Sequence, residues 1–253
     1  PKGCRPGGLF RRFSASALLR LNPPRFFNTS AGNAAAALHG RPRRVGADPA
    51  GDAATDDGWF SFKNGHSLLF SDMPNPSVRP GYATIMPRLV DTYGQGKAEW
   101  MMHRLRNLNI YPSLFFMDQI SSQLRIIRPV AWNKTEIISQ CIGVKGESDK
   151  DRENRIRQFE DFFNVSGMGT ADDLEEFRSC QNGYAGKAAP WNDLSRGAPL
   201  WIKGPDENAR KMGLTPLLSG ERSEDEGLFV CQHEYWAQEM RKAVAQERKG
   251  EKA

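Results

Sequence analysis

Two adjacent carboxylates, Asp172 and Asp173, are the residues whose type and spacing most favour chemistry. They follow Thr170 at the predicted start of a helix, where carboxylate oxygens can ligate a hard or borderline cation. The same residues also fit a capping box, in which Thr170 is the N-cap and Asp173 is the third helical residue. Acidic residues in a first turn are in addition stabilised by the helix dipole. Spacing alone leaves a metal site and a simple helix start both open.

The histidines do not complete a metal site by their spacing. A mononuclear non-haem iron site needs two histidines and one carboxylate on one face of the metal. The four histidines, His39, His66, His103 and His233, are too far apart in the sequence to form a close-spaced pair. A simpler interpretation places His66 in a hairpin turn, His103 on a helix and His233 in the C-terminal helix.

Four cysteines are scattered without a repeating spacing, which argues against a disulfide framework and favours free thiols in a reducing compartment. Cys231 and His233 form half of the pattern that holds a two-iron cluster with mixed ligands, but the partner C-x-x-H is absent from the sequence. The sequence also contains no P-loop, dinucleotide-binding glycine motif, nucleophile elbow or CxxC pair. Pattern alone therefore assigns no catalytic residue and no residue that binds an organic cofactor.

Charge is distributed unevenly along the chain. Of its 35 basic and 30 acidic residues, nine basic residues and one acid fall within residues 1–50. Residues 1–51 are predicted to be a basic, low-complexity, disordered arm. An organellar transit peptide, a tail that binds nucleic acid and out-of-frame sequence are three further interpretations of this arm. No run of 18 apolar residues exists, so no membrane-spanning helix is predicted.

The composition and hydrophobic patterns of residues 52–248 are typical of one α+β domain. Asn64-Gly65 between two hydrophobic runs predicts a β-hairpin, because both residues tolerate positive φ. Alternation and β-rich composition predict an antiparallel sheet with strands at residues 110–117, 121–132 and 135–144. Helical spacing predicts flanking helices at residues 82–93, 97–106, 148–163, from 170 to about 182, and about 229–245. Residues 185–222 are predicted to be rich in loops.

Several segments together resemble one enzyme family. They are Trp59–His66, Trp100–Pro112, Gln123–Pro129, and Phe159–Asn164 with Gly169–Asp173. These segments resemble the large subunits of the anthranilate- and benzoate-type Rieske dioxygenases, closely from about residue 52 to 177 and more loosely to residue 236. The resemblance implies the C-terminal part of the catalytic domain, built on an antiparallel sheet flanked by helices.

The resemblance also implies a reaction and a metal ligand. Family members hold a mononuclear Fe(II) between two histidines and one aspartate, and the aspartate is the second of a paired acid, which corresponds to Asp173. The implied reaction converts anthranilate or a related benzoate to catechol or a cis-diol, with both atoms of O₂ inserted into the ring. Three aromatic residues, Phe163, Phe159 and Phe116, are predicted to line the substrate pocket.

The resemblance further implies an assembly in the cytoplasm. Electrons would come from NADH through a separate flavin and iron-sulfur reductase, and a 2Fe-2S cluster is expected only in an N-terminal domain. The implied partners are a small (beta) subunit, other large subunits and the reductase, together with an aromatic carboxylate and O₂. Neither a membrane nor nucleic acid is an implied partner.

The sequence departs from the family pattern in its first 50 residues. They contain neither the cluster motifs nor the D-x-x-H-x4-H pair that should precede the matching region. Two hypotheses follow: a catalytic domain that is active only with the rest of its subunit, or a truncated, non-catalytic remnant. A third hypothesis, a nucleic-acid binder, depends only on the basic arm and predicts DNA retention that falls with salt.

Overall fold

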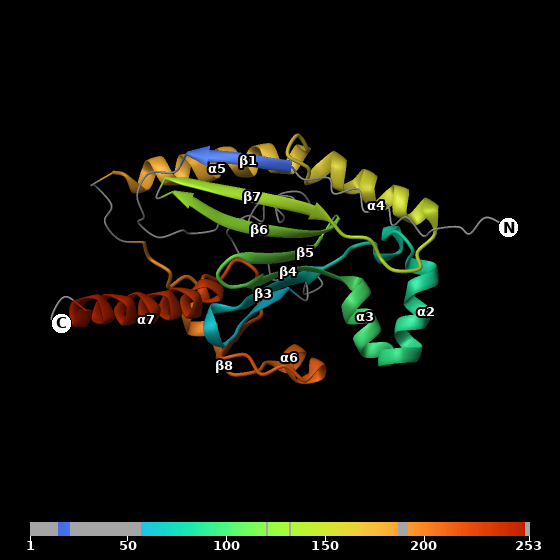
Figure 1. Ribbon diagram of the computed structural model, residues 1–253. Helices are drawn as coiled ribbons and strands as arrows, with labels where there is room; N and C mark the ends of the chain where they lie inside the picture. The colour runs from blue at the N-terminus through green and yellow to red at the C-terminus, as the bar shows by residue number, and fades with distance from the viewer. Residues whose placement is uncertain (1–14, 21–56, 120, 132, 187–191, 251–253) are drawn as a thin grey trace, which may run out of the picture.

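An antiparallel sheet organises the molecule. The computed structural model describes residues 15–20, 57–119, 121–131, 133–186 and 192–250. Nine strands in these stretches form one sheet in the order β1-β7-β6-β5-β4-β3-β2-β9-β8 (Figure 1). Their bounds are β1 (Ala15–Arg20), β2 (Gly58–Ser61), β3 (Ser67–Asp72), β4 (Arg104–Ile110), β5 (Leu114–Asp118), β6 (Ser122–Ala131), β7 (Lys134–Cys141), β8 (Ile202–Lys203) and β9 (Leu218–Gly220). The predicted α+β class with an antiparallel sheet is confirmed.

The predicted hairpin is confirmed. Strands β2 and β3 pair in antiparallel register, and a short 3-10 turn, η1 (Lys63–Gly65), joins them. Asn64 and Gly65 have φ values of 60° and 74°. Positive φ costs glycine and asparagine less than other residues, so Asn64 and Gly65 form the turn of the hairpin as predicted.

The predicted helix over residues 97–106 and the predicted strand over residues 110–117 were both placed wrongly. The helix α3 ends at His103, and the chain continues as β4 from Arg104 to Ile110. A turn at Tyr111 to Ser113, with a cis Tyr111–Pro112 bond, separates β4 from β5. Every residue of β4 from Arg104 to Asn109 pairs with β3, and this cross-strand pairing overrides the local helical spacing.

The region predicted to be rich in loops contributes more regular structure than expected. Short strands β8 and β9 pair with each other, and β9 pairs with β2, which extends the sheet. Between them lies helix α6 (Glu207–Met212), which Asp206 caps by accepting a hydrogen bond from the Ala209 N–H. Strands of two or three residues carry too short an alternation to be recognised from sequence.

Helices flank the sheet as predicted. Their bounds are α2 (Tyr82–Tyr93), α3 (Gln95–His103), α4 (Asp149–Phe162), α5 (Met168–Tyr184) and α7 (Gly227–Gly250), with 3-10 turns η2 (Pro76–Val78) and η3 (Ala198–Leu200). Gly94 separates α2 from α3, whereas Gly96 lies inside α3. Ser148 caps α4 by accepting from the Asp151 N–H.

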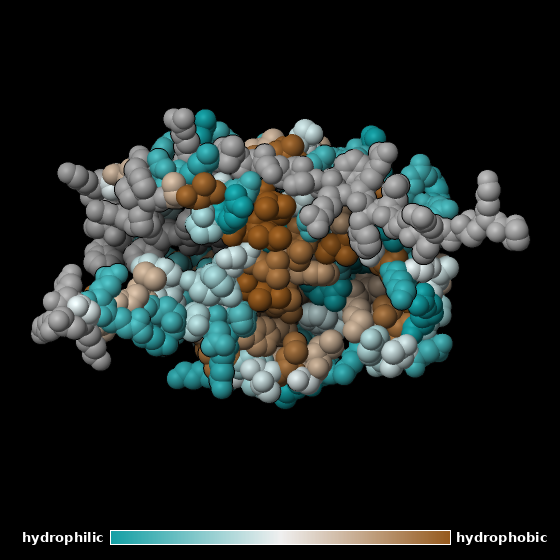
Figure 2. All heavy atoms as spheres, viewed as in Figure 1, coloured by the Kyte–Doolittle hydropathy of each residue, from teal (hydrophilic) through white to brown (hydrophobic). Residues whose placement is uncertain are grey.

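Side chains on the two faces of the central strands have different neighbours. On one face, α4 packs against β6 and β7, and its Phe159, Phe162 and Phe163 form a buried cluster with Met117. A second cluster, Phe60, Leu68, Phe70 and Ala209, lies farther along the sheet. Because side chains alternate along a strand, Leu114 and Phe116 point away from the α4 side. Apolar residues gather in the middle of the face seen in Figure 2, over the central strands.

Most of the predicted arm lies outside the described residues. Its described part is β1, which pairs with β7 along six residues at the edge of the sheet. The predicted disorder of the arm stays a prediction. Of the helices that the structure describes, none has both the length and the apolar character that a membrane span requires.

Candidate functional site

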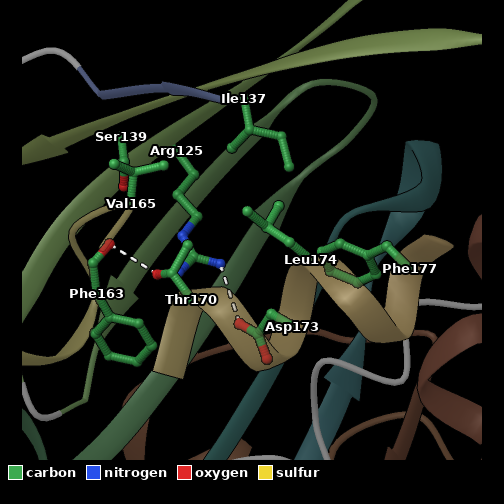
Figure 3. A pocket seen from close by; sticks show the side chains of 9 residues that line it. All are labelled: Arg125, Ile137, Ser139, Phe163, Val165, Thr170, Asp173, Leu174 and Phe177. Carbon is green, nitrogen blue, oxygen red and sulfur yellow. Dashed lines mark hydrogen bonds and ion pairs between the residues drawn. The ribbon is translucent and has the colours of Figure 1, made fainter. Parts of the chain in front are cut away.

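A pocket lies between the sheet and α5. Its walls come from β6, β7, the end of α4 and the first half of α5, and they surround a small cavity of about 20 Å³ that is partly open to solvent. Figure 3 shows the nine lining residues, which are Arg125, Ile137, Ser139, Phe163, Val165, Thr170, Asp173, Leu174 and Phe177. Most of this wall is apolar, with one arginine and one aspartate facing each other across it.

Sheet register positions one side of the pocket. Arg125 on β6 pairs with Phe115 on β5 and with Ser139 on β7, so these three side chains form one row across the sheet. The row lies on the face that α4 covers, because Phe115 packs against the α4 cluster. A shift of one residue in the β6 register would send Arg125 to the other face.

The helical repeat of α5 places the side chains on the other side of the pocket. Thr170, Asp173, Leu174 and Phe177 stand at positions i, i+3, i+4 and i+7 of α5, which is one face of a helix. Asp172 falls outside this face and is exposed. Of the paired acid, the helix therefore brings the second carboxylate to the pocket and leaves the first in solvent.

The start of α5 differs from the predicted capping box. The helix begins at Met168, with Gly167 as N-cap, so Thr170 lies inside the first turn. The Thr170 hydroxyl donates to the Phe163 carbonyl at 2.9 Å. This bond ties the first turn of α5 to the end of α4, which fixes the direction in which Asp173 points.

Two glycines make the close junction between α4 and α5 possible. A Cβ at Gly167 would lie 2.5 Å from the Phe162 carbonyl oxygen, and a Cβ at Gly169 would lie 2.5 Å from a ring carbon of Phe162. Side chains cannot occupy such distances without a shift of the helix. The two glycines are thus a packing requirement of the site.

Arg125 is the buried cation of the pocket. It is 8% exposed, its Nε donates to Gln123 Oε1 at 3.2 Å, and its guanidinium carbon lies 5.2 Å from the centre of the Phe163 ring. Its Nη1 lies 3.7 Å from Asp173 Oδ2, which is an ion pair longer than a good hydrogen bond (Figure 3). Its Nη2 is buried and has no partner among the described residues.

Burial dominates the electrostatics of this ion pair. Burial raises the pKa of Asp173, Arg125 opposes that rise, and the neighbouring Asp172 adds to it, so that the net shift is upward. Burial lowers the pKa of Arg125, and Asp173 opposes this effect. The charged forms of Arg125 and Asp173 therefore stabilise each other in this buried place. A second cation near Asp173 would stabilise its carboxylate further.

The structure separates the three predicted pocket phenylalanines. Phe163 lines the pocket. Phe159 is 1% exposed in the cluster beneath it and is not among the lining residues. Phe116 is 39% exposed and, by strand alternation, points to the opposite face of the sheet from Phe115.

The described histidines lie away from the pocket. His66 follows the η1 turn, as predicted, and His103 Nε2 lies 2.7 Å from the Tyr82 hydroxyl oxygen. His233 is in α7, where burial lowers its pKa, and His39 lies outside the described residues. No group of three potential metal ligands occurs within the described ranges.

The described residues therefore fit an iron site only in part. Asp173 is one carboxylate of the right kind, but the side chain that faces it is an arginine. Two histidines would be needed beside it to complete the family's ligand set. Described cysteines do not replace them, because none of Cys141, Cys180 and Cys231 lines the pocket.

Sequence reasoning missed Arg125. The signal was present, since an arginine between Gln123 and Ile127 occupies the same side of the strand as other inward residues. A charged residue on the buried side of a strand is uncommon without a partner or a ligand.

The chain is similar in sequence to several known proteins. No family model matches the sequence. The anthranilate 1,2-dioxygenase large subunit of Acinetobacter baylyi is 68% identical over 187 residues, which are 74% of this chain and 40% of that protein. The 2-halobenzoate 1,2-dioxygenase large subunit of Burkholderia cepacia is 55% identical over 192 residues, 76% of this chain and 41% of that protein. The toluate 1,2-dioxygenase subunit alpha of Pseudomonas putida is 54% identical over 190 residues, 75% of this chain and 41% of that protein.

These matches span about two fifths of the length of each relative. Solved structures share the fold at low identity. Naphthalene 1,2-dioxygenase from Rhodococcus, bound to indole, superposes with a TM-score of 0.65 at 20% identity, covering 90% of this chain and 56% of that one. A second naphthalene 1,2-dioxygenase with indole in its active site gives a TM-score of 0.61 at 11% identity, covering 88% of this chain and 53% of that one.

Proposed function

This chain carries a segment of the large-subunit family of benzoate-type ring-hydroxylating dioxygenases, and from that premise we propose that its pocket receives an aromatic carboxylate. Anthranilate is the substrate we favour, because the relative named for it is the most similar of the three reported. All three relatives are named for ring substrates that carry a carboxylate and differ in the other substituent. The proposed products are catechol from anthranilate, or a cis-diol from a related benzoate.

The observation that carries this proposal is the composition of the pocket wall. Ile137, Val165, Leu174 and Phe177 offer apolar surface to a flat ring, and Phe163 offers an aromatic one. Arg125 and Asp173 supply the few polar groups that orient a ligand. Apolar walls with a small number of placed polar groups are typical of small-molecule sites.

Asp173 is proposed as the carboxylate ligand of the family's mononuclear Fe(II). Its position on the pocket side of α5 supports this role, as does the second place that it holds in the paired acid. The described residues do not supply the remaining ligands. The proposal thus assigns the substrate wall and one ligand to the described part of the chain.

The same proposal includes the rest of the assembly. O₂ would be the co-substrate, and electrons from NADH would arrive through a separate reductase and a 2Fe-2S cluster. A small (beta) subunit and other large subunits would be the protein partners, in the cytoplasm. These cofactors and partners are inferred from the family and not from a contact in this structure.

A non-catalytic remnant is the second candidate function. The observation that favours it is the Arg125–Asp173 ion pair, which neutralises the proposed ligand without a metal. Such a chain would keep the sheet and the pocket but would hold no iron.

Ligand binding to the purified chain tests the proposed pocket. Anthranilate and benzoate should show saturation-transfer NMR signals, and Val165→Trp should abolish them, because a larger side chain at this lining position fills the pocket. Val165 is 39% exposed, so the fold tolerates the change. Val130→Trp, at a residue that is 48% exposed at the far end of β6, is the matched control and should bind as the parent does. Equal signals in the two variants would contradict the pocket assignment.

A further inference from the structure

We propose that Arg125 is the anchor for the carboxylate of the aromatic acid and that its Nη2 group is the donor reserved for that ligand. This inference rests on the proposed function and adds which side chain distinguishes an acid from a neutral ring. It also predicts that Asp173 competes with the ligand for the same guanidinium.

The unused donor is the first argument. Arg125 is 8% exposed, and two of its nitrogens are engaged: Nε with Gln123 and Nη1 with Asp173. Nη2 is buried and finds no acceptor in the described part of the chain. A buried donor without a partner is costly, and proteins retain few of them without a ligand or a water to satisfy them.

The geometry of the ion pair is the second argument. The Arg125 Nη1 to Asp173 Oδ2 distance of 3.7 Å is too long for the paired hydrogen bonds that a guanidinium makes with a carboxylate in a closed bidentate contact. Arg125 therefore retains donor capacity toward the pocket. A planar fork of N–H groups suits a carboxylate better than it suits any neutral group.

The support of the arginine is the third argument. Gln123 Oε1 accepts from Arg125 Nε at 3.2 Å and from the Ser139 hydroxyl at 2.9 Å. Gln123 is itself fully buried, so this acceptor is fixed. A guanidinium held in this way loses little freedom when a ligand binds, which favours affinity.

The surroundings select an aromatic acid. The Phe163 ring lies 5.2 Å from the guanidinium carbon, and the apolar side chains of Val165 and Leu174 line the same pocket. A ring would contact these walls while its carboxylate reaches Nη2. Figure 3 shows the arginine extending from the sheet toward α5, between these walls.

A pair of ligands that match in shape and differ in charge tests the anchor. The full chain, freed of metal with EDTA, is titrated with benzoate and with the neutral isostere benzamide, and each Kd is measured by NMR. The parent should prefer benzoate. Arg125→Gln should raise the Kd of benzoate at least about tenfold and leave that of benzamide within about twofold. Arg128→Gln, on the same strand with a side chain that is 62% exposed, should change neither Kd.

Asp173→Asn should change the Kd of benzoate in the opposite direction to Arg125→Gln. Because Asp173 competes for Arg125 and repels a second carboxylate, its neutralisation should tighten benzoate binding several-fold and leave benzamide unaffected. A benzoate Kd that stays the same or rises in Asp173→Asn would overturn the anchor.

The remaining outcomes separate the anchor from the pocket. If the parent binds neither ligand, the proposed function fails and the anchor fails with it. If the parent binds both ligands and Arg125→Gln weakens both equally or neither, the pocket stands and the anchor is wrong. Should Arg125→Gln unfold, the double variant Arg125→Gln with Asp173→Asn removes both charges, and a persisting preference for benzoate there would also overturn the anchor.

Discussion

At the scale of single residues, Asp118 is a highly constrained charge outside the pocket. It is 7% exposed at the end of β5 and accepts from Arg79 Nη1 at 2.9 Å, from Arg106, and from the Ser122 hydroxyl at 2.9 Å. These partners come from the loop before α2, from β4 and from the start of β6. One carboxylate thus joins three segments, and its removal would leave Arg79 and Arg106 without it.

Asp118→Asn should lower the free energy of unfolding by about 3–5 kcal/mol, because it breaks a buried ion pair from one side. Urea denaturation at pH 7 measures this loss. Asp161→Asn is the control, since Asp161 pairs with Arg157 on the exposed surface of α4 and should cost less than about 1 kcal/mol. Similar losses in the two variants would contradict the special role of Asp118.

Asp118 should also govern how the stability of the fold changes at acid pH. Burial alone would raise the pKa of Asp118, but Arg79 and Arg106 outweigh it, and the net shift is downward. A depressed folded pKa gives stability that is fully present above the unfolded value of about 3.9 and is lost as pH falls through the folded pKa. Below about pH 4, the parent should therefore lose stability more steeply than Asp118→Asn. Unfolding curves collected between pH 2.5 and 7 would show parallel pH profiles if this assignment were wrong.

At the scale of elements, the α4–α5 junction controls the pocket. Gly169→Ala should destabilise the protein by about 1–3 kcal/mol and weaken ligand binding, because the new methyl group would meet the Phe162 ring at 2.5 Å and shift α5. Urea unfolding and the benzoate titration measure the two effects. Gly183→Ala tests the same change near the end of the same helix, where nothing lies within 4 Å of the added Cβ. That control should stabilise the protein by up to about 1 kcal/mol.

Local signals explain which elements could be predicted from the sequence. The Asn64-Gly65 hairpin is confirmed because its own residues specify the turn, and the start of α4 is likewise specified by its Ser148 cap. Strand β4 was missed because its identity depends on pairing with β3 and β5, which its local spacing does not reveal. The true start of α5 was missed because Thr170 uses its hydroxyl to bond Phe163 instead of capping the helix.

At the scale of the whole molecule, the candidate site combines residues that are remote in sequence. Asp173 could be singled out beforehand, because the paired acid is visible in the sequence and the family resemblance assigns its second member a role. Arg125 was missed although its strand position was a signal, because its pairing with Asp173 arises only where β6 faces α5 in the folded chain. The pocket wall depends in the same way on sheet register and helix phase, which no single segment encodes.

Iron binding tests how complete this site is. The described residues bring one carboxylate to the pocket, with no group of three potential ligands within the described ranges. A single carboxylate that is already paired with an arginine holds Fe(II) weakly. The chain loaded anaerobically with Fe(II) should therefore retain well below one iron per chain after desalting, and the ion should shift the melting temperature little.

The opposite result would place further ligands in residues that the structure does not describe. Stoichiometric iron that is lost in Asp173→Asn and kept in Asp172→Asn would show that His39 or other such residues complete the site. Asp172 is the appropriate control because it is the adjacent acid, equally charged, and points to solvent. Retention in both variants would indicate iron bound elsewhere and would remove Asp173 from the metal site, while leaving the aromatic pocket and its arginine to be judged by ligand binding alone.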